Sequence, residues 1–187
     1  MAKIDSAEAL IRAVRAGAGI KYLHFWGHRP RPDGQLSASC LSQWWPSRFV
    51  VDGVSYATAE HWMMAGKARL FGDAEAERRV VAAGHPAEAK KAGRLVRNFD
   101  EATWERERFE IVARGSVHKF GADPALREYL LGTGDRVLVE ASPVDRIWGI
   151  GLAATDQAAT NPTQWKGLNL LGFALMEARE RLRTAGV

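Results

Sequence analysis

The alternation of apolar and polar residues along the chain predicts many short helices and only a few strands. Residues 6–16 begin with a capping serine and carry Leu10, Ile11 and Val14 at helical spacing. Short β-prone runs occupy residues 21–26, 49–56 and 136–140, and a loop of small and polar residues covers 153–166. The further expected helices cover residues 59–70, 74–83, 86–96, 100–120, 124–132 and a segment after 167–172 with an apolar repeat through Leu182.

The β-prone run 49–56 contains the strongest local signal, because Asp52-Gly53 between two apolar triplets predicts a hairpin with a type I′ turn. Thr58 is then expected to cap the next helix, which places Glu60 in its first turn. A carboxylate is favoured there by the exposed amide groups of the helix end alone. A catalytic role for Glu60 therefore needs support from elsewhere in the chain.

Residues 140–151 (EASPVDRIWGIG) place charged, aromatic and glycine residues directly after an apolar strand. Asp145 can carry a negative charge, Arg146 can hold a phosphate and Trp148 can stack on a flat ring. The two glycines allow the backbone to approach a ligand closely. This pattern predicts one wall of a small-molecule site.

Composition restricts the class of protein without selecting a function. The 187 residues suffice for one domain with a core, and a +4 net charge favours anionic ligands in general. The single cysteine, Cys40, excludes an intrachain disulfide and fits a reducing compartment. No apolar run is long enough to span a membrane, so a cytoplasmic protein without membrane contact is expected. We expect one domain over 1–187, with residues 1–20 as an N-terminal helical extension.

For several polar residues, the sequence allows either a structural or a functional role. Arg29 and Arg31 lie in a loop where they can meet a phosphate or simply be solvated. Asn169, at the start of the last helix, can cap that helix or reach a ligand. His24 and His28 are four residues apart but fall in a strand and a loop, which does not favour a metal site.

Six segments in the same order resemble the NADAR superfamily, the YbiA-like N-glycosidases, from about residue 25 to residue 181. They are residues 41–47 (LSQWWPS), 56–61 (YATAEH), 63–65 (MMA) with Lys67, 71–73 (FGD), 140–151 and 169–172 (NLLG). The resemblance implies a mainly α-helical, single-domain YbiA-like fold with a short hairpin and few short strands. It also implies cleavage of an N-glycosidic bond between ribose and a base, with no cofactor and no metal.

The resemblance assigns the catalytic carboxylates to Glu60 and Asp145. The side chains that it and the surrounding motifs place in substrate binding are Phe25, Arg29, Trp44, Lys67, Trp104, Arg146, Trp148 and Asn169. Two carboxylates suit this chemistry, because breaking the bond at C1′ of ribose develops positive charge on the sugar ring. We therefore expect Glu60 and Asp145 to face one cavity lined by Trp148.

The expected substrate is a small phosphoribosyl or ADP-ribosyl compound. Known relatives act on phosphoribosylamino-pyrimidine intermediates of riboflavin synthesis or on ADP-ribosylated guanine in nucleic acid, so both classes are candidates. The sequence departs from the family pattern at Gly66, where many relatives carry Glu or Gln, and at residues 43–45 (QWW), where Asn-Phe-Tyr is commoner.

Two other functions remain open at this point. A non-catalytic module that binds ADP-ribose or a nucleotide would explain Gly66 as a mark of lost activity. A nucleic-acid binder would explain the net charge and the seven tryptophans, although the basic residues are scattered rather than gathered on one predicted helix.

Overall fold

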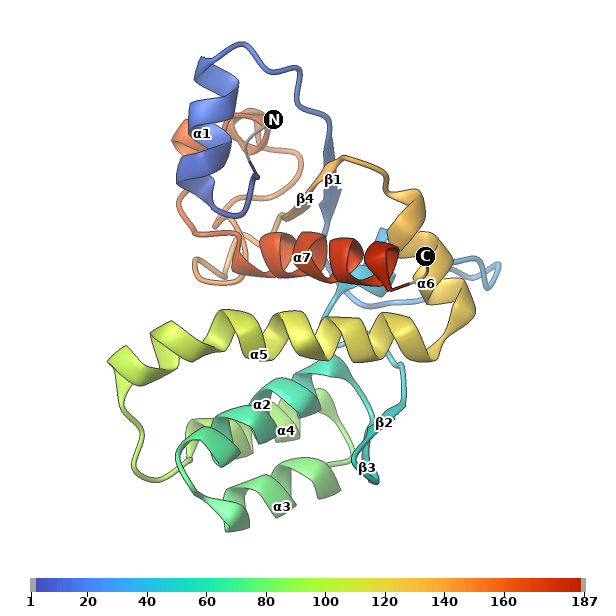
Figure 1. Ribbon diagram of the computed structural model, residues 1–187, viewed down its shortest axis with the longest axis vertical. Coiled ribbons are helices and arrows are strands. Elements are labelled where there is room, and N and C mark those ends of the chain that lie inside the picture. Colours follow the sequence, from blue (N-terminus) through green and yellow to red (C-terminus); the bar gives the residue numbers. More distant parts are fainter. Residues whose placement is uncertain (1–2, 186–187) are drawn as a thin grey trace. The chain divides into compact units, whose positions relative to one another are not determined.

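The computed structural model describes residues 3–185, which divide into two compact units. One unit comprises residues 1–42 with 128–187, and the other comprises residues 43–127. Helix α6 (Pro124–Gly132) crosses the boundary between them in the sequence. The described residues are mainly helical with a few short strands, which confirms the predicted fold class (Figure 1).

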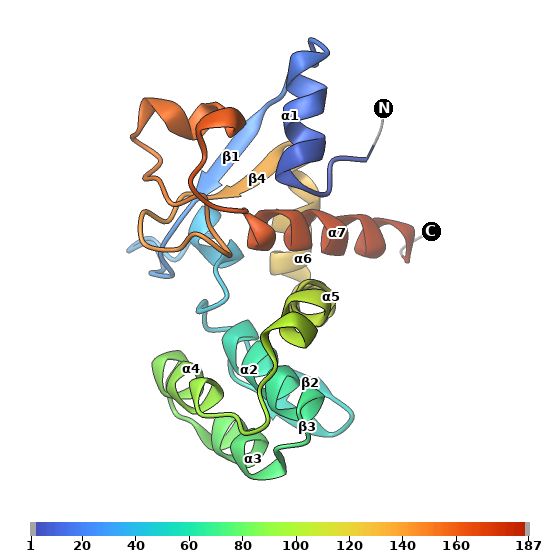
Figure 2. The ribbon, with the colours of Figure 1, turned by 90° about the vertical axis from the view of Figure 1, so that its left-hand side faces the viewer.

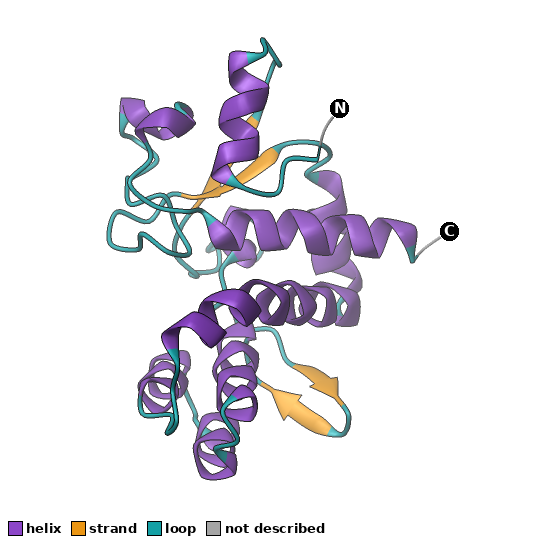
Figure 3. Cartoon of the chain, turned by 60° about the vertical axis from the view of Figure 1, so that its left-hand side comes forward, coloured by secondary structure: helices purple, strands orange, loops and turns teal. Residues whose placement is uncertain are grey.

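The unit of residues 43–127 is a group of helices preceded by the hairpin. Strands β2 (Phe49–Val51) and β3 (Val54–Tyr56) pair antiparallel, with Phe49 opposite Tyr56 (Figure 3). Asp52 and Gly53 both have positive φ, 49° and 78°, as a type I′ turn requires. The predicted hairpin and its turn are therefore confirmed.

Helix α2 (Ala59–Leu70) is the centre of this unit and contacts the three helices that follow it. These are α3 (Ala74–Ala82), α4 (Pro86–Arg94) and α5 (Glu101–Ala122) (Figure 1). The side chains of Thr58, Asp73 and Asp100 cap α2, α3 and α5, because each accepts a backbone N–H of the first turn. The caps explain why the helices begin where the sequence predicts them.

The other unit is built around two parallel strands. Strands β1 (Tyr22–Phe25) and β4 (Val137–Glu140) pair in parallel, from Tyr22 opposite Val137 to Phe25 opposite Glu140 (Figure 2). Helix α7 (Leu170–Thr184) packs on β4 through its apolar repeat, and α1 (Ala7–Arg15) begins at the predicted cap, Ser6. The sequence predicted both strands but not their pairing.

The remaining elements of this unit are short 3₁₀ helices. They are η1 (Ala38–Leu41), η2 (Gln157–Thr160) and η3 (Pro162–Gln164). The last two lie in the segment 153–166, where a loop without regular structure was expected; Asp156 and Asn161 cap them. Within residues 3–185, no helix is both long and apolar enough to cross a bilayer.

Candidate active site

The parallel pairing of β1 and β4 brings Phe25 to the start of the predicted loop 140–151. Phe25 lies opposite Glu140 in the strand register, and its carbonyl accepts the backbone N–H of Ala141 at 2.9 Å. The carboxyl ends of parallel strands meet at one edge of a sheet, where ligands commonly bind. Phe25 is buried and packs in the core rather than facing solvent. Its predicted contact with substrate stays a prediction.

The carboxylate of Asp145 holds its own loop in shape. Its Oδ1 atom accepts the backbone N–H groups of Ile147 at 2.8 Å and Trp148 at 2.7 Å. Its backbone carbonyl accepts the N–H of Gly151 at 3.0 Å, which closes the loop. One carboxylate oxygen is thus committed to structure, and the side chain is half-buried. The second oxygen makes no hydrogen bond to any residue within 3–185.

A second backbone segment, residues 166–171, is hydrogen-bonded to this loop along its length. The N–H groups of Leu168 and Leu171 donate to the carbonyls of Arg146 (3.0 Å) and Trp148 (3.1 Å). The two segments approach so closely that a Cβ atom on Gly167 would lie 2.3 Å from the Gly149 carbonyl oxygen. This second segment fixes the backbone that carries Arg146 and Trp148.

Asn169 does not cap α7 with its side chain. Its Oδ1 atom accepts the backbone N–H of Glu140, and its Nδ2 atom donates to the carbonyl of Leu138, both at 2.9 Å. The residue is fully buried and has a left-handed backbone with φ of 54°. The capping interpretation of Asn169 is therefore wrong: the amide joins the start of α7 to β4. Whether it also contacts substrate stays a prediction.

The predicted phosphate ligands of this unit are accessible. Arg29 and Arg146 are exposed, and neither forms an ion pair with a residue of the described range 3–185. Trp148 is half-buried. These three side chains are available to a ligand, unlike Phe25 and Asn169.

In the unit of residues 43–127, Glu60 occupies the first turn of α2, as predicted. It is 2% exposed, and its backbone N–H donates to the carbonyl of Gln43 at 3.0 Å. A charged carboxylate is rarely buried to this extent unless other groups stabilise it or its reactivity requires it. Simple attraction to an exposed helix end does not account for such burial.

Lys67 lies on the same face of α2 as Glu60, because seven helical residues correspond to a rotation offset of only about 20°. Its Nζ atom is 4.1 Å from the ring centroid of Phe99 and 5.5 Å from that of Trp104. Burial lowers the pKa of the Lys67 ammonium; Glu101 opposes this shift and Arg94 adds to it. The aromatic faces stabilise the charged form. Glu60, Lys67 and Trp104 thus offer a carboxylate, a cation and an indole.

Trp44 lies on the chain segment that leads into the hairpin. Its ring contacts the His85 ring edge-on at 5.9 Å, and the Lys90 ammonium lies 5.9 Å from the indole centroid. Its neighbour Gln43 supplies the carbonyl that binds the N–H of Glu60. The predicted contact of Trp44 with substrate stays a prediction.

The sequence interpretation missed Phe99. This residue is 41% exposed although its ring lies against Lys67 and meets Phe71 edge-on at 5.3 Å. Asn98, immediately before it, has a left-handed backbone, so the chain turns sharply at this point. Asn98, in a short connection between two helices, could have indicated the turn. No sequence motif marks Phe99 itself, because it is a single aromatic residue in a loop.

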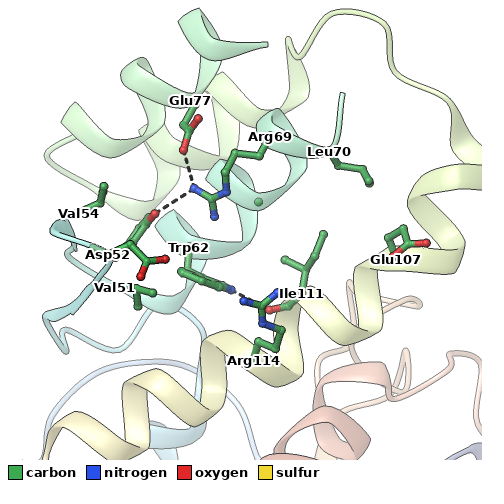
Figure 4. A pocket seen from close by; sticks show the side chains of 12 residues that line it. Val51, Asp52, Val54, Trp62, Arg69, Leu70, Glu77, Glu107, Ile111 and Arg114 are labelled. Atoms are coloured by element: carbon green, nitrogen blue, oxygen red, sulfur yellow. Dashed lines mark hydrogen bonds and ion pairs between the residues drawn. The ribbon is translucent and has the colours of Figure 1, made fainter. Parts of the chain in front are cut away.

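Gly66 lies away from Glu60, since six residues along a helix correspond to an offset of about 120°. A Cβ atom at Gly66 would be 2.7 Å from Cγ2 of Ile111 on α5. Gly66 instead lines a pocket of about 390 Å³ between α2, the hairpin and α5, together with Trp62 and Arg69 (Figure 4). Gly66 therefore serves close packing of α2 and α5.

The same pocket is lined by charges of both signs. Arg69 donates to the Tyr56 hydroxyl at 3.0 Å and to Glu77 at 2.5 Å, and its guanidinium lies 5.2 Å from the Trp62 ring (Figure 4). Trp62 donates its indole N–H to the carbonyl of Ile111 at 2.8 Å. These contacts tie the hairpin, α2, α3 and α5 together, so the pocket is primarily a junction of this unit.

A family model described as the NADAR domain matches residues 24–183, which is most of the chain. The chain belongs to the NADAR family. This NADAR protein is 40% identical over 165 residues to N-glycosidase R617 of Acanthamoeba polyphaga mimivirus, covering 86% of this chain and 95% of that one. It is 32% identical over 138 residues to the riboflavin biosynthesis protein PYRR of Zea mays, covering 70% of this chain and 20% of that one.

A solved structure shares the fold. The NMR structure of the Escherichia coli protein YbiA matches with a TM-score of 0.69 and 25% identity, covering 89% of this chain and 87% of that one. The recognition of a YbiA-like NADAR protein from its motifs is therefore confirmed. The names and identities of the NADAR relatives support N-glycosidase activity, a hydrolase reaction on an N-glycosyl compound.

Proposed function

We propose that this NADAR protein hydrolyses the bond between C1′ of ribose and a base nitrogen. The proposed substrate is a phosphoribosylamino-pyrimidine of the riboflavin pathway or an ADP-ribosylated base. The reaction class is supported by relatives named N-glycosidase, and the first substrate class by a relative named for riboflavin biosynthesis. ADP-ribosyl compounds are kept as a second class, because both share a phosphorylated ribose.

The observation that carries the proposal is the arrangement of α2. Glu60 is 2% exposed and shares its helix face with Lys67, whose ammonium lies over the rings of Phe99 and Trp104. A buried carboxylate, a cation and an indole meet three needs of the reaction: charge stabilisation, anion binding and stacking on a base.

The bond breaks with positive charge developing on C1′ and the ring oxygen of ribose. A carboxylate close to C1′ stabilises this cation, and a carboxylate close to the attacking water removes its proton. We assign these two tasks to Glu60 and Asp145 as a pair. The water oxygen becomes bonded to C1′, and the departing nitrogen takes up a proton, which balances the hydrolysis.

Two exposed arginines and two indoles suit the two ends of the substrate. Arg146 and Arg29 are exposed arginines without ion pairs within residues 3–185, and a guanidinium can bind phosphate oxygens in a bidentate manner. Trp104 and Trp148 are assigned to the base. Holding the substrate at both ends keeps C1′ near the carboxylates, which lowers the entropic part of the barrier.

The test is release of base from the two substrate classes. The purified protein is incubated with phosphoribosylamino-pyrimidine and with ADP-ribosylated DNA, and released sugar and base are measured by mass spectrometry. Glu60→Gln preserves shape and removes the charge, so we expect kcat to fall about 10²- to 10⁴-fold. Glu107→Gln, an exposed glutamate of α5, is the matched control and is expected to retain activity. Equal rates for Glu60→Gln and wild type would contradict the proposal.

The alternative of a non-catalytic module rested on Gly66. That residue is about 120° around the helix from Glu60 and packs against Ile111, so its lack of a side chain has a structural cause. Calorimetry with ADP-ribose separates the two functions. Tight binding without turnover of either substrate would favour the module.

A further inference from the structure

The residue directly after Glu60 is a histidine that is completely buried and hydrogen-bonded at both ring nitrogens. The Nδ1 atom of His61 lies 2.8 Å from the Thr58 hydroxyl oxygen, and its Nε2 atom lies 3.1 Å from the carbonyl oxygen of Ala83. His61 belongs to the YATAEH motif, yet the proposed chemistry gives it no task. Its contacts show a different role.

The partners of His61 fix its tautomer. A carbonyl oxygen can only accept, so Nε2 carries the hydrogen that is donated to Ala83. In the neutral ring, Nδ1 then has no hydrogen and accepts the hydroxyl hydrogen of Thr58. The Thr58 oxygen in turn accepts the backbone N–H of His61 at 3.4 Å. The Thr58 hydroxyl thus donates to the ring of His61 and accepts from its backbone, and both ring nitrogens of His61 are hydrogen-bonded.

These bonds fasten the first helical turn to separate parts of the same unit. His61 ties the turn to Ala83, the residue directly after α3, while Thr58 caps the turn from the segment that follows the hairpin. The backbone N–H of Glu60 donates to Gln43 on the segment before the hairpin at 3.0 Å. A turn held from three segments has little freedom to rotate about the helix axis, and the Glu60 side chain leaves from this turn.

We propose that His61, held as the neutral tautomer between Thr58 and Ala83, is a positioning residue that sets the direction of the Glu60 carboxylate. This inference rests on the proposed function of Glu60. A displacement of a catalytic group by about 1 Å costs on the order of 10²-fold in rate. The loss of either hydrogen bond of His61 therefore acts on kcat, while substrate binding is left intact.

The first experiment separates kcat from KM. His61→Leu removes both ring hydrogen bonds, and Thr58→Val removes the hydroxyl that binds Nδ1. We expect each to lower kcat at least tenfold with KM within about twofold of wild type, on the more active of the two substrate classes. Thr58→Ser keeps the hydroxyl and His61→Gln keeps a donor that can reach Ala83, so both are expected to recover most of the rate.

A matched control is His118, a half-buried histidine of α5 whose ring lies tilted against Trp62 with the ring centroids 5.1 Å apart, and which forms no hydrogen bond with Thr58 or Ala83. His118→Gln is expected to leave kcat unchanged. A general loss of stability would lower the activity of both histidine variants, whereas a positioning role affects only His61. If the His61→Leu protein does not fold, Thr58→Val and His61→Gln carry the comparison.

The second experiment observes Glu60 directly and does not depend on turnover. In protein labelled with ¹³C at the glutamate carboxyl carbons, the Glu60 signal is assigned by its disappearance in Glu60→Gln. We expect its chemical shift and titration to change in His61→Leu and Thr58→Val but not in His118→Gln. An unchanged Glu60 signal would overturn the inference, even if kcat falls.

The outcomes distinguish this inference from the proposed function. If wild type releases no base from either substrate, the proposed function fails, and the NMR titration alone decides the role of His61. If wild type is active, His61→Leu is combined with Glu60→Gln. An equal loss from His61→Leu in both backgrounds, or an effect on KM alone, would show that His61 does not act through Glu60.

Discussion

The Oδ1 atom of Asp145 accepts the backbone N–H of Trp148 at 2.7 Å, so a residue proposed for catalysis also shapes the loop that presents the indole. The same oxygen accepts the N–H of Ile147 at 2.8 Å. Charge and hydrogen bonding at this position are therefore separable, because an asparagine amide oxygen can accept the same two bonds without carrying a charge.

Substitution of Asp145 tests this separation. We expect Asp145→Asn to retain the loop and the melting temperature but to lose about 10²- to 10⁴-fold in kcat. Asp145→Ala should in addition lower the free energy of unfolding by about 1 kcal/mol, because two backbone N–H groups lose their acceptor. Asp156 is the control: its Oδ1 accepts the N–H of Ala158 at 2.9 Å in the same way. Asp156→Asn should leave kcat unchanged, and full activity of Asp145→Asn would remove Asp145 from the mechanism.

The contact between Asp73 and Arg97 predicts a loss of stability in acid. Side-chain and backbone hydrogen bonds from Arg97 and the N–H of Ala76 hold the pKa of the buried Asp73 carboxyl far below its ordinary value. The unfolded chain takes up a proton near pH 4 whereas the folded chain resists it, so the stabilisation is present above about pH 4 and is lost below it.

Urea unfolding of wild type and Asp73→Asn measures this contribution. Asp73→Asn should be less stable at pH 7 and should show a flatter decline of stability between about pH 4 and pH 2. Asp100→Asn is a suitable comparison, because Asp100 caps α5 through Thr103 without a paired arginine side chain. If the unfolding free energies of wild type and Asp73→Asn decline equally between about pH 4 and pH 2, Asp73 is not the source of the acid sensitivity.

The burial of His61 predicts a second pH dependence in a different range. Burial lowers the pKa of the imidazole; the Ala83 carbonyl and Glu88 oppose this shift, and His85 adds to it. The neutral ring is therefore favoured in the folded protein. Stability is complete above about pH 6.5 and declines as the pH falls through 6.5 towards the lower folded pKa, because only the unfolded chain then binds the proton.

The difference in unfolding free energy between wild type and His61→Gln, measured from pH 8 to pH 5, isolates this effect. The difference should be largest above pH 6.5 and should shrink below it. His118 also has a pKa lowered by burial and by Arg114, so His118→Gln must be measured in parallel. A difference that is constant with pH would show that His61 does not titrate on unfolding.

The close contact between Gly66 of α2 and Ile111 of α5 predicts that a side chain at position 66 destabilises the protein. Alanine is favoured over glycine within a helix by about 1 kcal/mol, but overpacking costs about 1–3 kcal/mol. The Cβ atom would lie 2.7 Å from the stiff Cγ2 branch of Ile111. We therefore expect Gly66→Ala to lower the unfolding free energy by about 1 kcal/mol.

Removing the Ile111 side chain tests whether steric crowding causes the destabilisation by Gly66→Ala. Gly66→Ala should cost less in an Ile111→Ala background, which is a non-additive effect expected of residues in contact. Gly132, the last residue of α6, has no neighbour within 4 Å of a built Cβ atom, so Gly132→Ala should be neutral or stabilising. Equal effects at both glycines would indicate that packing against Ile111 is unimportant.

Local elements could be predicted because their causes lie within a few residues. Asp52-Gly53 supplies the positive φ angles of the hairpin turn, and Thr58 supplies the acceptor that starts α2. The family also followed from short ordered motifs, and the matching of residues 24–183 confirms it. The placement of Glu60 in the first turn of α2 was correct for the same local reason.

Contacts between distant segments decided what the motifs could not. Asn169 had the position of a helix cap, yet its amide binds β4, because the carbonyl of Leu138 and the N–H of Glu140 are brought to it by packing of α7. From the sequence, Gly66 resembled a site residue that had been lost. In the structure, Ile111 of α5 lies too close to Gly66 for a side chain there. Phe99 lies over Lys67, 32 positions away in the chain.

The sequence by itself determined the helices, the hairpin, the family and the candidate carboxylates, because propensity, capping and motif order are properties of neighbouring residues. Only the tertiary structure decided which side chains are already committed to holding the backbone. Asp145 uses one oxygen for its loop, whereas His61 uses both ring nitrogens to fix the turn that carries Glu60. Those partners come from folding, since hydrogen-bond donors and acceptors far apart in the chain must be paired once they are buried.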